Sequence, residues 1–91
     1  MAALIRRRVV VHGLVQGVGF RFAAVRAAEQ RGVAGWVRNR GDGTVEAVFE
    51  GEPDAVDALV EFTRAGPGHA QVSSLDVATE EPEGLRGFDV R

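Results

Sequence analysis

The chain has 91 residues, of which 45% are hydrophobic and 26% are charged, a balance that is ordinary for one soluble globular domain over residues 1–91. A formal net charge of −2 argues against a general nucleic-acid binder, because such proteins carry a net basic face. Cysteine and lysine are both absent, which excludes thiol catalysis, disulfides, Schiff-base chemistry and a Walker lysine. No stretch approaches the roughly 20 apolar residues of a membrane span, so we expect a cytoplasmic protein without a membrane partner.

Residues 4–12 are predicted to form a β-strand because most apolar and polar side chains fall on opposite faces, although Arg7 interrupts the apolar face near its start. The face that we expect to be buried carries Ile5, Val9 and Val11. The opposite face carries Arg6, Arg8 and His12. We interpret the arginines at residues 6–8 as a solvated strand end rather than an anion patch, and His12 as a surface residue, because isolated surface charges are the norm.

A glycine-rich loop at residues 13–21 joins this strand to a helical pattern. Gly13, Gly17 and Gly19 permit backbone conformations in which successive amide N–H groups point into one concavity. The helix that begins near Phe20 adds its unpaired N–H groups and the positive end of its dipole. Arg21 adds a planar fork of donors that fits two phosphate oxygens. The loop therefore indicates an anion site, although a plain turn with a solvated arginine would have the same pattern.

Residues 20–31 are predicted to form a helix that ends at Gly32, which suits the position after a helix C-terminus. Its small apolar stripe permits close packing on a sheet and consists of Phe20, Ala23, Ala24, Ala27 and Ala28. Phe22 and Val25 lie off this stripe. They either border the site or fill a corner of the core.

Residues 33–39 read as a second strand in which Val37 and Asn39 share one face and Trp36 and Arg38 the other. If Val37 faces the helices, Asn39 lies near the glycine loop, where its amide suits the binding of a water molecule. Alternatively, Asn39 only begins the turn at residues 40–43. We expect Trp36 to cover the sheet rather than to stack on a nucleic-acid base.

Residues 44–51 form the next expected strand, and its core face carries Val45, Ala47 and Phe49. Glu46 and Glu50 fall on the other face together with Thr44 and Val48. We expect this open face to be acidic and to repel a nucleic-acid backbone.

A second helix is expected to begin at Pro53 and to end before Gly66 and Pro67. One face carries Val56, Leu59, Val60 and Thr63, with Ala55 and Phe62 beside them. The solvated face carries Asp54, Asp57, Glu61 and Arg64. His69, in the loop that follows, is expected to be a surface residue.

Residues 71–79 alternate as a further strand that makes Val72, Leu75 and Val77 available to the core. Residues 80–84 form an acidic turn that connects elements, and residues 87–91 form a short final strand. The predicted order βαββαβ, with this strand added, corresponds to a ferredoxin-like α+β sandwich with an antiparallel sheet and two helices on one face. Because many unrelated functions share this fold, the function must be argued from the loop, Arg21 and Asn39.

Four motifs of the chain resemble those of the acylphosphatase family, in the family's order and with similar spacing. They lie at residues 15–21 (VQGVGFR), 35–39 (GWVRN), 42–46 (DGTVE) and 66–70 (GPGHA). One departure is Leu14, where the family usually has arginine, and this bears on the charge of the loop and on substrate affinity.

The resemblance implies hydrolysis of an acyl phosphate to a carboxylate and inorganic phosphate, which would also be a competitive inhibitor. It implies that Arg21 binds and polarises the phosphoryl group and that Asn39 orients the attacking water. In the scheme that it implies, catalysis needs no metal or cofactor. The sequence leaves the oligomeric state open, and nothing in it demands more than a monomer. The backbone that would cradle the phosphate belongs to Val15, Gln16, Gly17, Val18, Gly19 and Phe20. Because the leaving carboxylate has a conjugate acid of pKa about 4, no general acid is required.

Two other functions stay open. The loop would also suit a module that binds an anion or small ligand without hydrolysis, or a domain that acts on carbamoyl phosphate for a larger maturation protein, as acylphosphatase-like domains of hydrogenase maturation factors do. An RNA-recognition domain shares the element order but needs exposed aromatic residues where this chain has Glu46, Val48 and Glu50.

Overall fold

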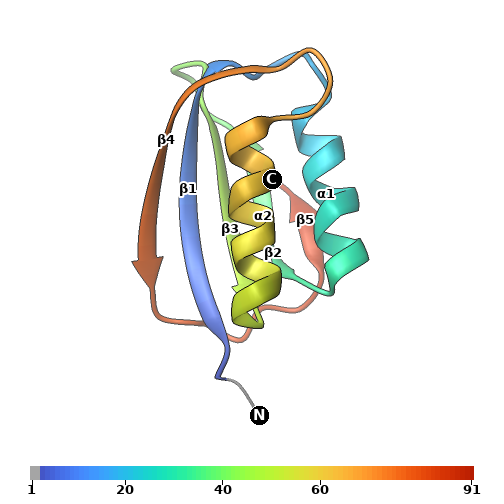
Figure 1. Ribbon diagram of the computed structural model, residues 1–91, viewed down its shortest axis with the longest axis vertical. Coiled ribbons are helices and arrows are strands. Elements are labelled where there is room, and N and C mark those ends of the chain that lie inside the picture. The colour runs from blue at the N-terminus through green and yellow to red at the C-terminus, as the bar shows by residue number, and fades with distance from the viewer. Residues whose placement is uncertain (1–2) are drawn as a thin grey trace.

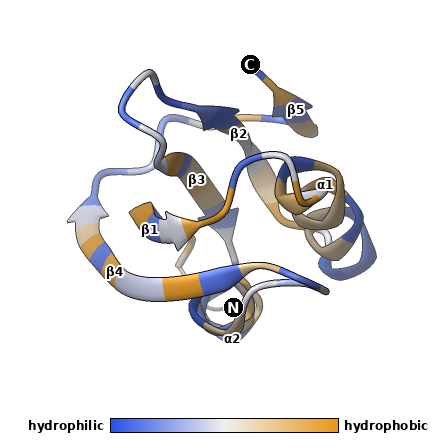
Figure 2. Cartoon of the chain, turned by 90° about the horizontal axis from the view of Figure 1, so that it is seen from above, coloured by the Kyte–Doolittle hydropathy of each residue, from blue (hydrophilic) through white to orange (hydrophobic). Residues whose placement is uncertain are grey.

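The computed structural model describes residues 3–91, which form two layers: a sheet and a pair of helices packed on one of its faces (Figure 1). The elements follow one another as β1 (Ile5–Leu14), α1 (Phe20–Arg31), β2 (Ala34–Asn39), β3 (Val45–Gly51), α2 (Pro53–Ala65), β4 (Gln71–Glu80) and β5 (Phe88–Val90). Seen along the strands, both helices lie on the same side of a twisted sheet (Figure 2). The predicted ferredoxin-like βαββαβ arrangement is confirmed.

The sheet has five strands in the order β4-β1-β3-β2-β5. Neighbouring strands are antiparallel except at one edge, where β5 runs parallel to β2 and pairs Gly35 with Phe88 and Val37 with Val90. The prediction of an antiparallel sheet is therefore wrong at this edge. After β4, at one edge of the sheet, the chain crosses to the opposite edge, where β5 runs in the same direction as β2.

Helix α1 packs on the sheet through Phe20, Ala24 and Ala28, which are buried, while Ala23 and Ala27 are only half-buried. It ends as predicted at Gly32, where a φ of 66° lets the chain turn while the N–H of Val33 donates to the carbonyl of Ala28 at 2.9 Å. The small side chains allow the helix to approach the sheet closely.

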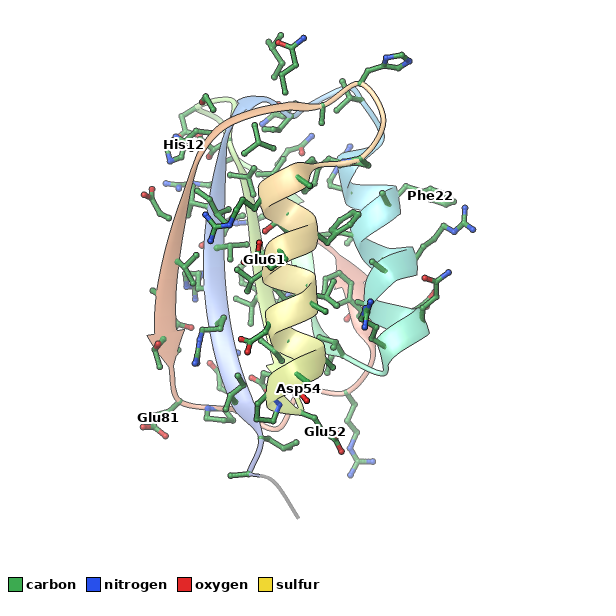
Figure 3. All side chains as sticks on the ribbon, viewed as in Figure 1. His12, Phe22, Glu52, Asp54, Glu61 and Glu81 are labelled. Carbon is green, nitrogen blue, oxygen red and sulfur yellow. The ribbon has the colours of Figure 1, made fainter. Side chains whose placement is uncertain are left out.

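Helix α2 begins with Pro53 and presents the predicted face to the sheet, with Val56, Leu59, Val60 and Thr63 buried. The Thr63 hydroxyl is satisfied because it donates to the carbonyl of Val60 at 2.7 Å. Asp54 and Glu61 lie on the solvated side of the helix, as expected (Figure 3). His69 is exposed, as the sequence predicted.

The core lies between the helices and the sheet. Val45, Ala47 and Phe49 of β3 are fully buried there, and the rings of Phe49 and Phe88 stack with their centroids 5.7 Å apart. A bulge opposite Gly13 changes the register of β4, so that both Val72 and Leu75 pack against the core. Val77 is paired with Val9 but stays 44% exposed on the edge strand, so the prediction that it joins the core is wrong.

The arginines of β1 are not a solvated strand end. Arg6 is only 3% exposed, and its guanidinium pairs with Glu50 at 2.6 Å and with Glu80 at 2.8 Å. Arg8 pairs with Glu46 and with Glu80, and Arg38 pairs with Glu46 at 2.6 Å. Because the strands place these groups side by side, the face predicted to be acidic is a network of matched charges.

Trp36 lies on this same face and is 7% exposed. The guanidinium carbons of Arg91, Arg8 and Arg38 lie 4.9, 5.5 and 5.7 Å from the centre of its ring. The tryptophan therefore covers the sheet, as predicted, and is itself covered by arginines. His12 forms one further pair on β1, with Asp76 at 2.9 Å.

The connection from β4 to β5 is held by a buried carboxylate. The oxygens of Glu50 accept hydrogen bonds from the backbone N–H groups of Glu83, Gly84 and Leu85 at 2.9, 3.1 and 3.1 Å. The segment predicted as an acidic turn is thus a connection, as expected, and it delivers the chain to β5. There the N–H of Arg91 donates to the carbonyl of Val37 at 2.9 Å.

Candidate active site

The loop between β1 and α1 has the backbone that an anion site requires. Gly17 and Gly19 have φ values of 75° and 78°, in the left-handed region that other residues rarely adopt. Gly19 is also the residue at the N-terminal cap of α1, and no side chain caps the helix there. The first N–H groups of α1 therefore remain available to a ligand beside the positive end of the helix dipole.

Gly13 serves a different purpose at the start of the loop. A Cβ atom there would lie 2.1 Å from the carbonyl oxygen of Gln71, so β1 and β4 can approach this closely only without a side chain. Leu14, which follows, is 65% exposed and does not line the pocket described below. It contributes no charge to the site in place of the family's arginine.

The side chain of Gln16 connects the loop to the β2–β3 hairpin. Its Nε2 atom donates to the carbonyl oxygens of Arg40 at 2.8 Å and Thr44 at 2.9 Å. The hairpin turn is itself closed by Asp42, whose carboxylate accepts from the hydroxyl and the N–H of Thr44 at 2.6 and 3.0 Å. Both bonds lower the pKa of the Asp42 carboxyl, and the bond from the hydroxyl has the larger effect. The hairpin that carries Asn39 is thus attached to the loop.

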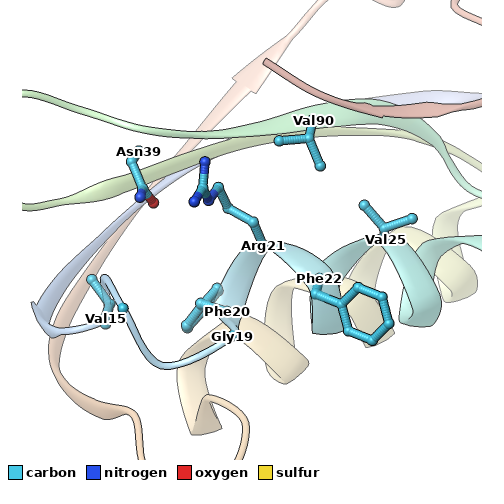
Figure 4. A pocket seen from close by; sticks show the side chains of 9 residues that line it. Val15, Gly19, Phe20, Arg21, Phe22, Val25, Asn39 and Val90 are labelled. Atoms are coloured by element: carbon cyan, nitrogen blue, oxygen red, sulfur yellow. The ribbon is translucent and has the colours of Figure 1, made fainter.

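The loop, the start of α1 and the end of β2 enclose a pocket of about 450 Å³. The predicted site residues that line it are Val15, Gly17, Gly19, Phe20, Arg21 and Asn39. The guanidinium of Arg21 and the amide of Asn39 point toward each other across the pocket (Figure 4). Asn39 therefore lies on the helix side of the sheet, facing the loop rather than only beginning a turn.

Two of the predicted residues do not line the pocket. The side chain of Gln16 is turned to the hairpin, and Val18 packs against the core. Their proposed contribution is through the backbone, which does not depend on where these side chains point.

The charge of the pocket is positive. Arg21 is exposed and, within residues 3–91, its side chain forms no ion pair or hydrogen bond, whereas Arg6, Arg8 and Arg38 are paired with glutamates. Among the described residues that line the pocket none is acidic, and Arg21 is the one that is charged. The site is suited to an anion that brings its own acceptor oxygens.

Three apolar residues complete the pocket, namely Phe22, Val25 and Val90. The sequence predicted two alternatives for Phe22 and Val25, a place at the border of the site or a place in the core. Phe22 borders the site and is 67% exposed, while Val25 borders it and also packs against the core. Val90 was not predicted as a site residue, because its position depends on the parallel pairing of β5 with β2.

Residues 3–91 contain no group of three or more His, Cys, Asp or Glu side chains that could hold a metal ion. No helix in this part of the chain has the length and apolar character to cross a bilayer.

Comparison with known proteins identifies the family of this chain. The acylphosphatase family model matches residues 7–90. An acylphosphatase of Gloeobacter violaceus is 57% identical over 90 residues, which cover 99% of this chain and 97% of that protein. The crystal structure of an acylphosphatase from Bacillus subtilis superimposes with a TM-score of 0.92 at 38% identity, covering 96% of this chain and 98% of that one.

A second kind of neighbour is a larger protein. HypF from T. kodakarensis matches with a TM-score of 0.82 at 30% identity over 96% of this chain but only 12% of its own. The family model, the full-length relatives and the structural match agree on the family and on the fold. The chain belongs to the acylphosphatase family.

Proposed function

We propose that this protein hydrolyses acyl phosphates, with the backbone of residues 15–20 and Arg21 binding the phosphoryl group and Asn39 orienting the attacking water. The observation that carries the proposal is the convergence of left-handed glycines, an unpaired guanidinium and a carboxamide on one pocket. The family and the names of its relatives support the reaction.

The site residues suit phosphoryl transfer because this reaction depends mainly on positioning and on stabilising charge at the equatorial oxygens. Backbone N–H groups of the loop and of the first turn of α1 donate to those oxygens. The guanidinium of Arg21 donates to two of them at once and lies at the positive end of the helix dipole. The backbone donors are fixed by the fold before substrate binds, so they need little reorganisation during the reaction.

The bond changes balance without a general acid. The water oxygen attacks phosphorus, the bond between phosphorus and the acyl oxygen breaks, and the carboxylate leaves with the electron pair. The water then loses a proton to the phosphate product or to solvent. The carboxylate departs as an anion because its conjugate acid has a pKa of about 4. Asn39 accepts a hydrogen bond from the water through its carbonyl oxygen and so aims a lone pair at phosphorus.

Hydrolysis of benzoyl phosphate in water enriched in oxygen-18 tests the reaction. We expect catalytic turnover in which the label enters inorganic phosphate and not benzoate, with phosphate acting as a competitive inhibitor. Label in benzoate would show attack at the carbonyl carbon and contradict the role of the loop. Phosphate binding without turnover of benzoyl, acetyl or carbamoyl phosphate would instead identify a non-catalytic anion-binding module.

A further inference from the structure

We propose that Phe22, Val25 and Val90 form a subsite for the acyl group, and that this subsite favours substrates whose acyl group is bulky and apolar over acetyl phosphate. The proposal rests on the proposed function, because the acyl group reaches this surface only when its phosphoryl group occupies the glycine loop.

One half of the pocket, here called the apolar half, is lined by the accessible apolar residues Phe22, Val25 and Val90, whereas Val15 on the other side is buried. The pocket's volume of about 450 Å³ lies within the range of roughly 300–1,000 Å³ that is usual for sites of small organic ligands, and it exceeds the size of a phosphoryl group. Asn39 and Val15 lie on one side of Arg21, while Val90, Val25 and Phe22 lie on the other (Figure 4). A substrate whose phosphoryl group is held by Arg21 and the loop can therefore extend its acyl group along the apolar side.

The apolar half brings together two large hydrophobic side chains that are exposed to solvent. The exposed large hydrophobic residues among residues 3–91 are Leu4, Leu14, Phe22, Val77 and Val90. Two of them, Phe22 at 67% and Val90 at 51% exposure, come from different elements and border the same pocket. Scattered apolar residues are normal on a surface, but two that border one pocket beside an anion site provide area that a ligand can cover.

The phenyl ring is also supported from outside the pocket. Phe22 stands out from α1 (Figure 3), and the guanidinium carbon of Arg26, one turn later on the helix, lies 5.8 Å from its ring centre. Val25 is anchored because it packs against the core. Val25 is thus fixed by packing before an acyl group arrives, and Arg26 flanks the ring of Phe22.

The remaining lining residues give an acyl group little else to bind. Within residues 3–91, Arg21 is the one charged residue that lines the pocket, and the proposed function assigns it to the phosphoryl group. The contact available to the acyl group is therefore apolar, and its strength grows with the apolar area that the group buries. A benzoyl group covers more of the apolar half than an acetyl group.

The test compares kcat/KM for benzoyl phosphate with kcat/KM for acetyl phosphate in each variant, because the ratio between variants cancels the different intrinsic reactivity of the two substrates. We expect Phe22→Ala to lower the benzoyl-to-acetyl ratio about threefold to tenfold, and Val90→Thr, which keeps the shape of the side chain, to lower it about twofold or more. Val77→Thr is the matched control, since Val77 is 44% exposed on β4 and outside the pocket, and its ratio should equal that of the wild type.

A binding measurement separates this proposal from the proposed function. Benzoylphosphonate and acetylphosphonate carry the same two acyl groups but lack the bond to be hydrolysed. Calorimetry should show tighter binding of benzoylphosphonate by the wild type and a smaller difference between the two phosphonates in Phe22→Ala. If the wild type hydrolyses neither acyl phosphate, the proposed function fails. The calorimetric comparison of the two phosphonates then still decides for or against the subsite, because it does not depend on turnover.

Two outcomes would overturn the subsite. One is a benzoyl-to-acetyl ratio that Phe22→Ala and Val90→Thr both leave unchanged. The other is a dimer at assay concentration, measured by light scattering, that Phe22→Ala converts to a monomer, because the patch would then be occupied by a second copy of the chain.

Discussion

The side chain of Gln16 donates a hydrogen bond to the carbonyl oxygen of Thr44 at 2.9 Å, which joins the loop of Gly17 and Gly19 to the hairpin of Asn39. A second bond, to the carbonyl of Arg40 at 2.8 Å, strengthens this connection. The two halves of the proposed site come from segments far apart in the sequence, so their relative position depends on contacts of this kind.

Replacing Gln16 with alanine should loosen that connection. We expect kcat for benzoyl phosphate to fall about tenfold, because a neutral hydrogen bond contributes roughly 0.5–1.5 kcal/mol and two are lost. KM should change much less, since Arg21 and the loop backbone stay. Gln30→Ala, at an exposed position of α1, is the control. An effect on unfolding alone, with kcat intact, would show that Gln16 is structural and does not position the site.

Replacing Arg21 with alanine should remove the positive group of the pocket. We expect kcat/KM to fall by about 100-fold or more, the range seen when a single charge-stabilising donor is lost, together with weaker inhibition by phosphate. Arg31→Ala removes an exposed arginine from the other end of the same helix and controls for net charge. Equal losses in the two variants would mean that charge acts at long range and that Arg21 does not contact the substrate.

Asn39 is expected to act on the water rather than on the phosphate. In Asn39→Ala, kcat should fall about 100-fold, while the inhibition constant of phosphate should stay within about threefold of the wild-type value. Asn39→Asp keeps the shape of the side chain but adds a negative charge, so it should weaken phosphate binding as well. Wild-type turnover by Asn39→Ala would contradict the proposed role.

Stability depends on the buried pair of Arg6 and Glu50. Glu50→Gln removes the charge that faces a buried guanidinium and weakens the bonds from residues 83–85, so the free energy of unfolding should fall by about 3–5 kcal/mol. Urea denaturation measures this loss. Glu52→Gln, at an exposed position, should change the free energy by less than about 0.5 kcal/mol. Similar values for the two variants would show that the carboxylate does not hold the β4–β5 connection.

The same network sets the dependence of stability on pH. Burial alone would raise the pKa values of Glu46 and Glu50, but hydrogen bonds outweigh it and both pKa values are lowered. Glu46 accepts from Arg38 and Arg8. Glu50 accepts from the N–H of Glu83 and from Arg6. The pKa of Glu80 is lowered mainly by Arg8 and then by Arg6.

Because these folded-state pKa values lie below the unfolded value of about 4.3, the unfolded chain binds more protons at acidic pH. The stability from these groups is present above that value and is lost as the pH falls through the folded pKa values. Urea denaturation should give a nearly constant free energy from about pH 6 to pH 7 and a decline below about pH 5, with a shallower decline in Glu50→Gln. A free energy that rises as the pH is lowered from 6 to 4 would contradict this assignment.

The order of the elements and the residues of the loop could be predicted from the sequence because their signals are local. Apolar spacing along α2, the glycine after α1 and the left-handed glycines of the loop all depend on neighbours within a few residues. The same local pattern, together with its resemblance to a family, pointed to Arg21 and Asn39.

Only the tertiary structure decided the partners of the charged face and the apolar wall of the pocket. Arg6 meets Glu50 and Glu80 across 44 and 74 residues of sequence, so no local pattern distinguishes a buried pair from a solvated strand end. Val90 reaches the pocket because β5 lies at the far edge of the sheet and runs parallel to β2, after a connection whose backbone donates hydrogen bonds to the carboxylate of Glu50 on β3. Burial and charge pairing are properties of the assembled layers, and a single strand does not contain them.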